Sequence, residues 1–128
     1  MSRAILLIED NEQNRYLLTF LLERSGYVVW AYADGAHGIE AAQTLVPALI
    51  LLDIQLPTMD GYAVARALRQ KEALRAIPIV AVTSYAMPGD REKALAAGCT
   101  GYIEKPINPD TFVAEMELAL SAPREREP

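Results

Sequence analysis

The stretch ALILLD, Ala48 to Asp53, decides the fold class, because five consecutive apolar residues end in a carboxylate. Two other runs share the continuous apolar pattern, AILLI from Ala4 to Ile8 and IVAV from Ile79 to Val82. Strands that are apolar at every position are typical of a parallel sheet whose two faces are both covered by helices. These three runs are therefore predicted to be the central strands of such a sheet.

Each apolar run is followed by a segment with helical periodicity, which predicts an alternation of strands and helices. Two weaker runs, Tyr27 to Trp30 and Tyr102 to Ile103, are more polar or shorter and suit the edges of the sheet. With right-handed crossovers, the order 2-1-3-4-5 follows. The predicted fold class is α/β, a flavodoxin-like doubly wound parallel sheet of five strands with five helices.

The five helices are expected to begin and end at recognisable signals. The first runs from near Glu12 to Gly26, the second follows Asp34, and the third spans about Asp60 to Lys71. The fourth, from roughly Pro88 to Ala97, has only Ala94, Leu95 and Ala97 to bury, so we expect it to pack least firmly. The fifth should have Asn108 as its cap and Pro109 at its first position, with Phe112, Val113, Met116, Ala119 and Leu120 facing inward.

Composition points to one folded domain and excludes several classes of protein. Of 128 residues, 52% are hydrophobic and 23% are charged, which is enough apolar material for a core. Residues 1–122 are expected to form the domain, and PREREP at 123–128 a solvated tail. The net charge of -5 gives no attraction for nucleic acid or an anionic membrane surface.

Cysteine usage and the lack of long apolar segments predict a cytoplasmic protein. Cys99 is the single cysteine, so no internal disulfide can form. The apolar run from Ala4 to Ile8 stops at Glu9, which is too short for a signal peptide. No stretch approaches the ~18 continuous apolar residues of a membrane-spanning helix.

Ionisable and polar residues follow the predicted strands at the edge where a doubly wound sheet places its ligand. Glu9 and Asp10 follow the first strand, Asp53 the third and Thr83 the fourth, while Lys105 lies just beyond the fifth. Three carboxylates in one crevice repel one another by about 4 kcal/mol per pair at ~4 Å and an effective dielectric near 20. We therefore expect a neutralising cation in addition to the lysine.

The chemistry of the donors indicates which cation this is. Oxygen ligands with no nearby histidine or cysteine favour Mg²⁺, with Mn²⁺ as a substitute. With one divalent ion, the formal charges of Glu9, Asp10, Asp53, Lys105 and the metal sum to zero. Such a site could accept a phosphoryl group, whose oxygens the metal, Lys105 and a hydroxyl hydrogen bond from Thr83 would bind.

Four motifs carry a resemblance to a known family: IEDN (Ile8 to Asn11), LLDIQLPTMDG (Leu51 to Gly61), AVTS (Ala81 to Ser84) and the pair Lys105-Pro106. From Ala4 to about Leu120 the sequence resembles the response regulator receiver domains of two-component signalling. Within that family it is most similar to the stand-alone receivers related to DivK, which carry no output domain.

The resemblance implies a role for each matching residue. Asp53 would accept a phosphoryl group from a sensor histidine kinase or a histidine phosphotransfer protein, and Lys105 and Thr83 would bind the transferred group. Metal ligands would be the carboxylates of Glu9, Asp10 and Asp53 and the backbone carbonyl of Gln55. A cis peptide bond is expected before Pro106.

The resemblance also implies how such a domain would signal. Thr83 and Tyr102 would form a switch pair, and Gln55 and Tyr85 would flank the phosphoryl position. The readout surface for a downstream protein would be the fourth helix, fifth strand and fifth helix. The domain would catalyse its own phosphorylation and dephosphorylation, without being a separate output enzyme.

Three other functions deserve comparison with the receiver hypothesis. An aspartyl phosphohydrolase of the haloacid dehalogenase type needs a second acid two residues after its nucleophile, where this chain has Gln55. A flavodoxin must cradle a phosphate in its first loop, where Glu9 and Asp10 would repel it. A receiver-like scaffold that is never phosphorylated is disfavoured because the whole acceptor set is present.

Overall fold

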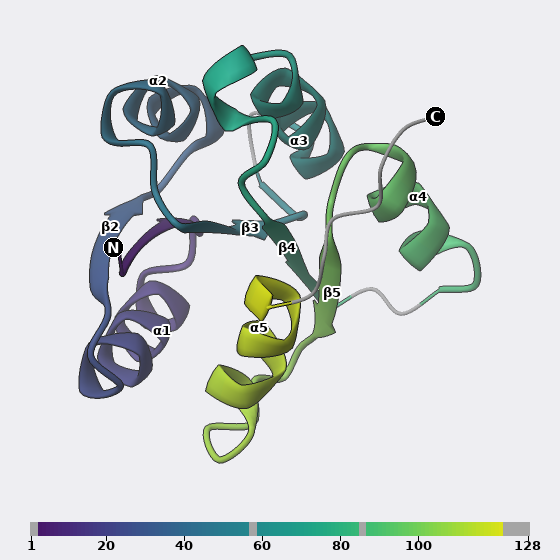
Figure 1. The fold of residues 1–128 in the computed structure, drawn as a ribbon. Helices are drawn as coiled ribbons and strands as arrows, with labels where there is room; N and C mark the ends of the chain where they lie inside the picture. The colour runs from purple at the N-terminus through teal and green to yellow at the C-terminus, as the bar shows by residue number, and fades with distance from the viewer. Residues whose placement is uncertain (1–2, 57–58, 85–86, 122–128) are drawn as a thin grey trace.

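A five-stranded parallel sheet forms the centre of the molecule (Figure 1). The structure is a computed structural model and describes residues 3–56, 59–84 and 87–121. Its strand order is β2-β1-β3-β4-β5, which confirms the predicted topology. The strands are β1 (Ala4–Ile8), β2 (Val28–Tyr32), β3 (Leu49–Asp53), β4 (Ile79–Thr83) and β5 (Gly101–Glu104). Every residue of β1, β3 and β4 is buried, as expected of central strands covered on both faces.

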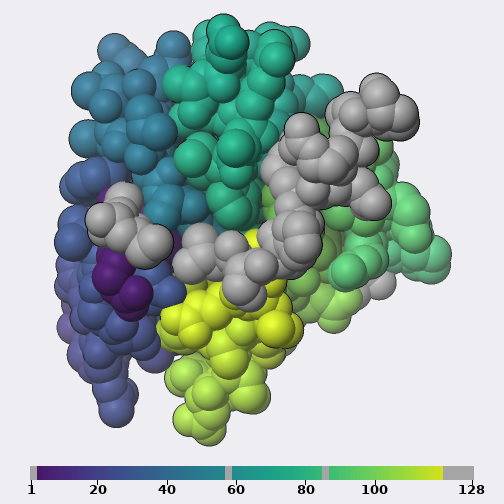
Figure 2. All heavy atoms as spheres, in the orientation of Figure 1, coloured from purple at the N-terminus to yellow at the C-terminus, as the bar shows by residue number. Residues whose placement is uncertain are grey.

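Helices cover both faces of the sheet and create two separate cores. The helices are α1 (Glu12–Arg24), α2 (Gly35–Leu45), α3 (Gly61–Arg69), α4 (Asp90–Ala96) and α5 (Phe112–Ser121), with a 3-10 turn η1 (Glu72–Leu74). One core joins α1 and α5 to the sheet, and the other joins α2, α3 and α4 to the opposite face (Figure 1). On the molecular surface, α1 and α5 accordingly lie on one side and α2 and α3 on the other (Figure 2). Alternate residues of each central strand, such as Leu6 and Leu7 of β1, belong to different cores.

Side-chain caps fix where the helices begin, at the same edge of the sheet. Asn11 accepts a hydrogen bond from the Asn14 amide at 2.8 Å, and Asp34 accepts one from the His37 amide at 2.9 Å. Gly26, with φ of +94°, follows α1 in the left-handed conformation that the sequence predicts. The caps hold the loops that follow β1 and β2 close to the carboxyl ends of the strands.

The structure corrects several predicted boundaries. β2 begins at Val28 rather than Tyr27, α3 ends at Arg69 rather than Lys71, and α4 begins at Asp90 rather than Pro88. Pro109 is not the first residue of α5, which begins at Phe112. The Asn108 side chain accepts a hydrogen bond from the Asp110 amide at 3.0 Å, which keeps Pro109 in a turn.

α4 packs lightly, but not in the way that its sequence predicts. Ala94 is buried and Ala97 just after the helix is also buried, whereas Leu95, expected to face inward, is 46% exposed. One step along a helix rotates the side chain by about 100°, so Leu95 points away once Ala94 faces the sheet. Among the helices described, none is both long and apolar enough to span a membrane.

Candidate functional site

The register of the parallel strands brings four polar residues to one edge of the sheet. Asp53 ends β3 and pairs with Val82, while Thr83 ends β4 and pairs with Glu104 of β5. Glu9 directly follows β1, and Lys105 directly follows β5. Glu9, Asp53 and Thr83 are almost fully buried, at 1%, 3% and 1% exposure, so their polar groups interact where little water screens them.

Three carboxylates meet at this edge, as the sequence predicts. Glu9, Asp10 and Asp53 each offer an oxygen, and these oxygens lie within 4.8 Å of one another. Burial, followed by the charge of Asp53, raises the pKa of Glu9 to about 7. Burial also raises the pKa of Asp10, with a hydrogen bond and charge repulsion from Asp53 as further causes. The cluster therefore favours taking up a positive charge, either protons or a metal cation.

Lys105 supplies part of that positive charge. Its Nζ lies 3.3 Å from Oε1 of Glu9 and 3.5 Å from Oδ2 of Asp53. The backbone amide of Lys105 donates to the Thr83 carbonyl at 2.8 Å, and the Lys105-Pro106 bond is cis, as expected. The amine of Lys105 is thus directed at the carboxylates across the end of β4.

The donor set fits a hard divalent cation. Oε1 of Glu9 is buried and accepts no hydrogen bond from any group in the described part of the chain, so a ligand position remains available to it. One lysine cannot balance three ionised carboxylates, and oxygen ligands suit Mg²⁺ or Mn²⁺. The observed cluster contains all three carboxylates that the sequence assigned to a metal.

Gln55 connects Asp53 to the end of β4 in a way that sequence reasoning missed. Its amide N–H donates to Oδ1 of Asp53 at 2.9 Å. Its side-chain Oε1 accepts from the Ser84 amide at 2.8 Å, from Ser84 Oγ at 2.7 Å and, more weakly, from Thr83 Oγ1 at 3.4 Å. The sequence showed polar residues after both strands, but not that this side chain would bridge them.

Arg15 is a second residue that sequence reasoning missed. Its Nη1 donates to the carbonyl of Glu9 at 2.8 Å and to that of Asp10 at 3.3 Å. These bonds hold the backbone of both acidic residues against α1. The available signal was helical spacing, because Arg15 precedes the buried Leu18 and Leu22 by three and seven residues on one face of α1.

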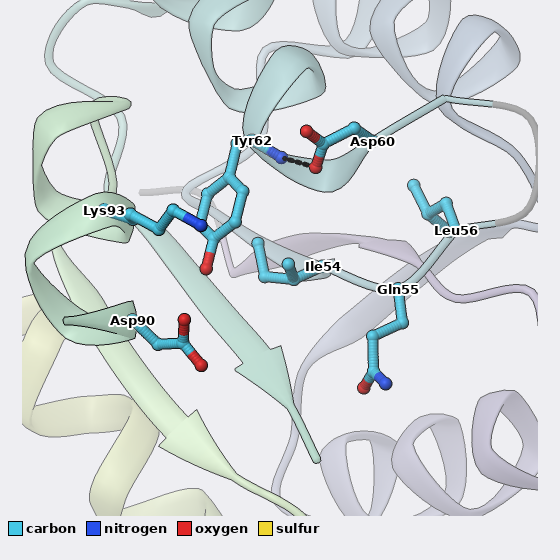
Figure 3. Close-up of a pocket in the computed structure, with 7 residues that line it drawn as sticks. All are labelled: Ile54, Gln55, Leu56, Asp60, Tyr62, Asp90 and Lys93. Carbon is cyan, nitrogen blue, oxygen red and sulfur yellow. Dashed lines mark hydrogen bonds between the residues drawn. The ribbon is translucent and has the colours of Figure 1, made fainter. Parts of the chain in front are cut away.

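Two cavities open beside the site. One of about 560 Å³ lies next to Lys105 and is lined by Asn14, Leu17, Ser84, Lys105, Pro106 and Ile107. The other, of about 490 Å³, lies between the loop after β3 and α4 and is lined by Ile54, Gln55, Leu56, Asp60, Tyr62, Asp90 and Lys93 (Figure 3).

The structure describes only some of the residues that the family resemblance connects with switching and with the phosphoryl position. Tyr102 of β5 is half-buried and packs against the core beneath α3 and α4. Tyr85, expected to flank the phosphoryl position, lies outside the described residues. The same holds for the predicted tail at 123–128, and the packing of Leu120 is likewise not described.

Comparison with known proteins places these features in a family. The model of the response regulator receiver domain matches residues 5–117. The polar-differentiation response regulator DivK of Brucella abortus is 42% identical over 120 residues, which cover 94% of this chain and 98% of that protein. DivK of Brucella anthropi is 41% identical over the same shares of the two chains.

Solved structures agree with the sequence relatives. The chemotaxis response regulator CheY4 of Vibrio cholerae matches with a TM-score of 0.88 and 27% identity, covering 93% of this chain and 99% of that one. The receiver domain of the sensor histidine kinase PA1611 from Pseudomonas aeruginosa matches with a TM-score of 0.86 and 34% identity, covering 95% and 100%. That structure has a magnesium ion coordinated in its active-site cleft.

Proposed function

We propose that this chain, which belongs to the response regulator receiver domain family, is the phospho-accepting domain of a two-component or phosphorelay system. Asp53 accepts the phosphoryl group from a phosphohistidine of a sensor histidine kinase or a histidine phosphotransfer protein. One observation supports this most strongly: the Lys105 amine lies 3.5 Å from Oδ2 of Asp53, in a cluster with two further carboxylates.

The residues of the site provide a nucleophile and two groups that bind phosphoryl oxygens, as in-line phosphoryl transfer requires. An oxygen of the Asp53 carboxylate attacks phosphorus, a P–O bond forms, and the P–N bond of the phosphohistidine breaks with its electron pair left on the imidazole nitrogen. The product is an acyl phosphate. Lys105 and the Thr83 hydroxyl bind oxygens of the transferred group, so positioning and electrostatics carry the catalysis.

The same site can reverse the modification. Water attacks phosphorus, the P–O bond to Asp53 breaks, and the carboxylate is restored together with inorganic phosphate. The protein thus catalyses its own phosphorylation and dephosphorylation, and we assign it no separate enzymatic output.

The carboxylates of Glu9, Asp10 and Asp53, with the backbone carbonyl of Gln55, would hold Mg²⁺, for which Mn²⁺ could substitute. When bound, the divalent ion neutralises negative charge on the phosphoryl oxygens. Oε1 of Glu9 supports this ligand set, because it is buried, accepts no hydrogen bond within the described residues and has the Lys105 amine at 3.3 Å as its ion-pair partner.

Two alternative activities are less consistent with the site. A phosphohydrolase of the haloacid dehalogenase type requires an acid at the place of Gln55, which is an amide whose oxygen accepts hydrogen bonds from Ser84. A flavodoxin requires a phosphate-binding first loop, whereas this loop carries Glu9 and Asp10. Carboxylates at that position repel a flavin phosphate.

The readout surface is proposed on α4, β5 and α5. Leu95 of α4 and Leu118 of α5 are 46% and 72% exposed, which provides apolar contact area for a downstream protein. Thr83 and Tyr102 would couple the phosphoryl group to this surface, with the lightly packed α4 shifting between two positions. The domain limits at residues 1–122 and the cytoplasmic location stay predictions.

Incubation with acetyl phosphate and Mg²⁺, followed by intact mass measurement, tests the proposal. We expect a gain of one phosphoryl group that is lost in Asp53→Asn. Asp60→Asn is the matched control, because Asp60 caps α3 through the Tyr62 amide and asparagine preserves such a cap. A phosphoryl gain that persists in Asp53→Asn would show that another residue is the acceptor.

A further inference from the structure

We propose that the Gln55 side chain is a latch that holds the end of β4 in its resting position and competes with an incoming phosphoryl group for the donors there. The inference rests on the proposed function and adds to it a residue that sets how readily the site accepts the group. Gln55 acts through Thr83 and Ser84, so it is a positioning residue rather than a catalytic one.

Three donors converge on one acceptor atom. Oε1 of Gln55 accepts from the Ser84 amide at 2.8 Å and from Ser84 Oγ at 2.7 Å, and Thr83 Oγ1 lies 3.4 Å away. An amide oxygen has two lone pairs, which the two short bonds from Ser84 occupy. The contact of the Thr83 hydroxyl with this saturated acceptor is therefore weak, while Ser84 is bound to it by two short hydrogen bonds.

The latch is built into the same segment as the phosphoacceptor. Gln55 stands two residues after Asp53, and its own amide donates to Oδ1 of Asp53 at 2.9 Å. A phosphoryl group on Asp53 would therefore arrive next to the Gln55 side chain. Both the phosphoryl oxygens and Oε1 are acceptors, so they compete for the hydroxyl of Thr83 and the backbone amide of Ser84, while the Ser84 hydroxyl only holds the latch closed.

Charge decides this competition in favour of the phosphoryl group. Hydrogen bonds to an ionised acceptor are roughly twice as strong as those to a neutral amide oxygen. The latch thus does not prevent phosphorylation, but part of the binding free energy is used to displace it. Removing Oε1 should make the active arrangement easier to reach.

Space exists for the displaced side chain. The cavity of about 490 Å³ is lined by Gln55 together with Asp60 and Tyr62. Figure 3 shows the Gln55 amide turned away from Asp60 and Tyr62. Rotation of the side chain toward this cavity would release Ser84 without repacking the core.

Gln55→Met tests the latch because methionine has a similar length and no amide oxygen, and the backbone carbonyl assigned to the metal remains. The probe is beryllofluoride, a tetrahedral phosphoryl mimic, titrated with Mg²⁺ present and followed by fluorine NMR. We expect Gln55→Met to bind it about fivefold more tightly than the unaltered protein, because the resting state loses two short hydrogen bonds and each contributes about twofold, at the low end for a hydrogen bond. Gln70→Met, at an exposed position after α3, is the matched control and should leave the affinity unchanged.

Ser84→Ala distinguishes the proposed latch from a merely structural role of Gln55. The substitution removes one of the two short bonds to Oε1, so it should tighten binding about twofold on its own. In the Gln55→Met background it should have no further effect, since the acceptor is already gone. Hydrogen exchange of the Ser84 amide in the resting protein should be faster in Gln55→Met.

The outcomes separate the latch from the proposed function. Unchanged or weaker binding by Gln55→Met, additive effects of the two substitutions, or unchanged exchange at Ser84 would each overturn the latch while leaving the phosphoacceptor intact. Failure of the unaltered protein to bind beryllofluoride would overturn both.

Discussion

The amine of Lys105 reaches Oδ2 of Asp53 across an intervening strand, at a distance of 3.5 Å. β4 lies between β3, which ends with Asp53, and β5, which Lys105 directly follows, so the lysine side chain passes over the end of β4. The lysine is largely buried, with a side-chain exposure of 14%, and its amine therefore interacts with the carboxylate under weak solvent screening. Phosphoryl transfer at Asp53 should depend strongly on this contact.

Replacing Lys105 with methionine is expected to slow phosphorylation by acetyl phosphate about a hundredfold, a magnitude typical for removal of one preorganised charge-stabilising donor. The physical reason is that the developing charge on the phosphoryl oxygens loses a fixed positive partner. Phosphorylation rates from intact mass would measure the change. Lys71→Met, which removes a lysine beside η1, serves as the control, and a rate for Lys105→Met within twofold of that control would contradict the assigned role.

The raised pKa of Glu9 predicts how stability depends on pH in the metal-free protein. The pKa is about 7 in the folded protein against an ordinary value of 4.5, so the folded state binds more protons between these values. The free energy of unfolding should therefore fall as the pH rises from 4.5 to 7, by at most about 3 kcal/mol. The stabilising contribution of Glu9 protonation is complete below pH 4.5 and lost above pH 7.

Urea unfolding in the presence of EDTA, at several pH values, measures this dependence. Glu9→Gln keeps the shape of the side chain but cannot titrate, so the free energy of unfolding of this variant should change less with pH over the same range. Saturating Mg²⁺ should raise the stability of the unaltered protein more at pH 8 than at pH 5, because the ion binds ionised carboxylates. Parallel pH profiles for the two proteins would show that Glu9 does not titrate as proposed.

Gly61 couples the start of α3 to the backbone next to Asp53. A Cβ added there would lie 2.4 Å from Cα of Ile54 and 2.8 Å from the carbonyl oxygen of Asp53. Because both are backbone atoms, the loop itself must move. Gly61→Ala should therefore destabilise the protein by about 1–3 kcal/mol and weaken Mg²⁺ binding in a calorimetric titration.

Gly35→Ala provides the comparison for Gly61. Its added methyl group would meet the end of the Val64 side chain, with Cγ2 at 2.7 Å, and that side chain can adjust more readily than backbone. We expect a smaller loss of stability and no change in Mg²⁺ affinity. Equal effects of the two substitutions on metal binding would disprove the link between Gly61 and the site.

Continuous apolar runs were sufficient to predict the sheet and the edge at which the site lies. Runs such as Ala4 to Ile8 define central strands, and parallel pairing then places Glu9, Asp53 and Lys105 together, as the structure confirms. The prediction was possible because the order and the parallel direction of the strands determine which residues lie together at the carboxyl edge of the sheet.

Features that depend on side-chain direction were not predictable in the same way. The bridge from Gln55 to Ser84 requires the turn geometry after two strands, and the bonds from Arg15 require a particular rotamer. Leu95 was expected to be buried because it is apolar, although the rotation of α4 on the sheet turns it outward. Residue type gives the chemistry of a position, whereas its contacts follow from packing.

Val46 combines a β-branched side chain with a left-handed backbone, at φ of +43°. This conformation ends α2, with the Val46 amide donating to the Ala42 carbonyl at 2.9 Å, and it is one that asparagine adopts far more readily. Because Val46 is 41% exposed, Val46→Asn removes only part of a valine's buried surface, and relief of the backbone strain should increase the free energy of unfolding by about 1 kcal/mol. Val28→Asn is the matched control, since Val28 is exposed on the edge strand β2, where valine is favoured over asparagine. Urea unfolding should show opposite signs for the two substitutions, and a loss of stability in both would mean that the backbone at Val46 is not strained.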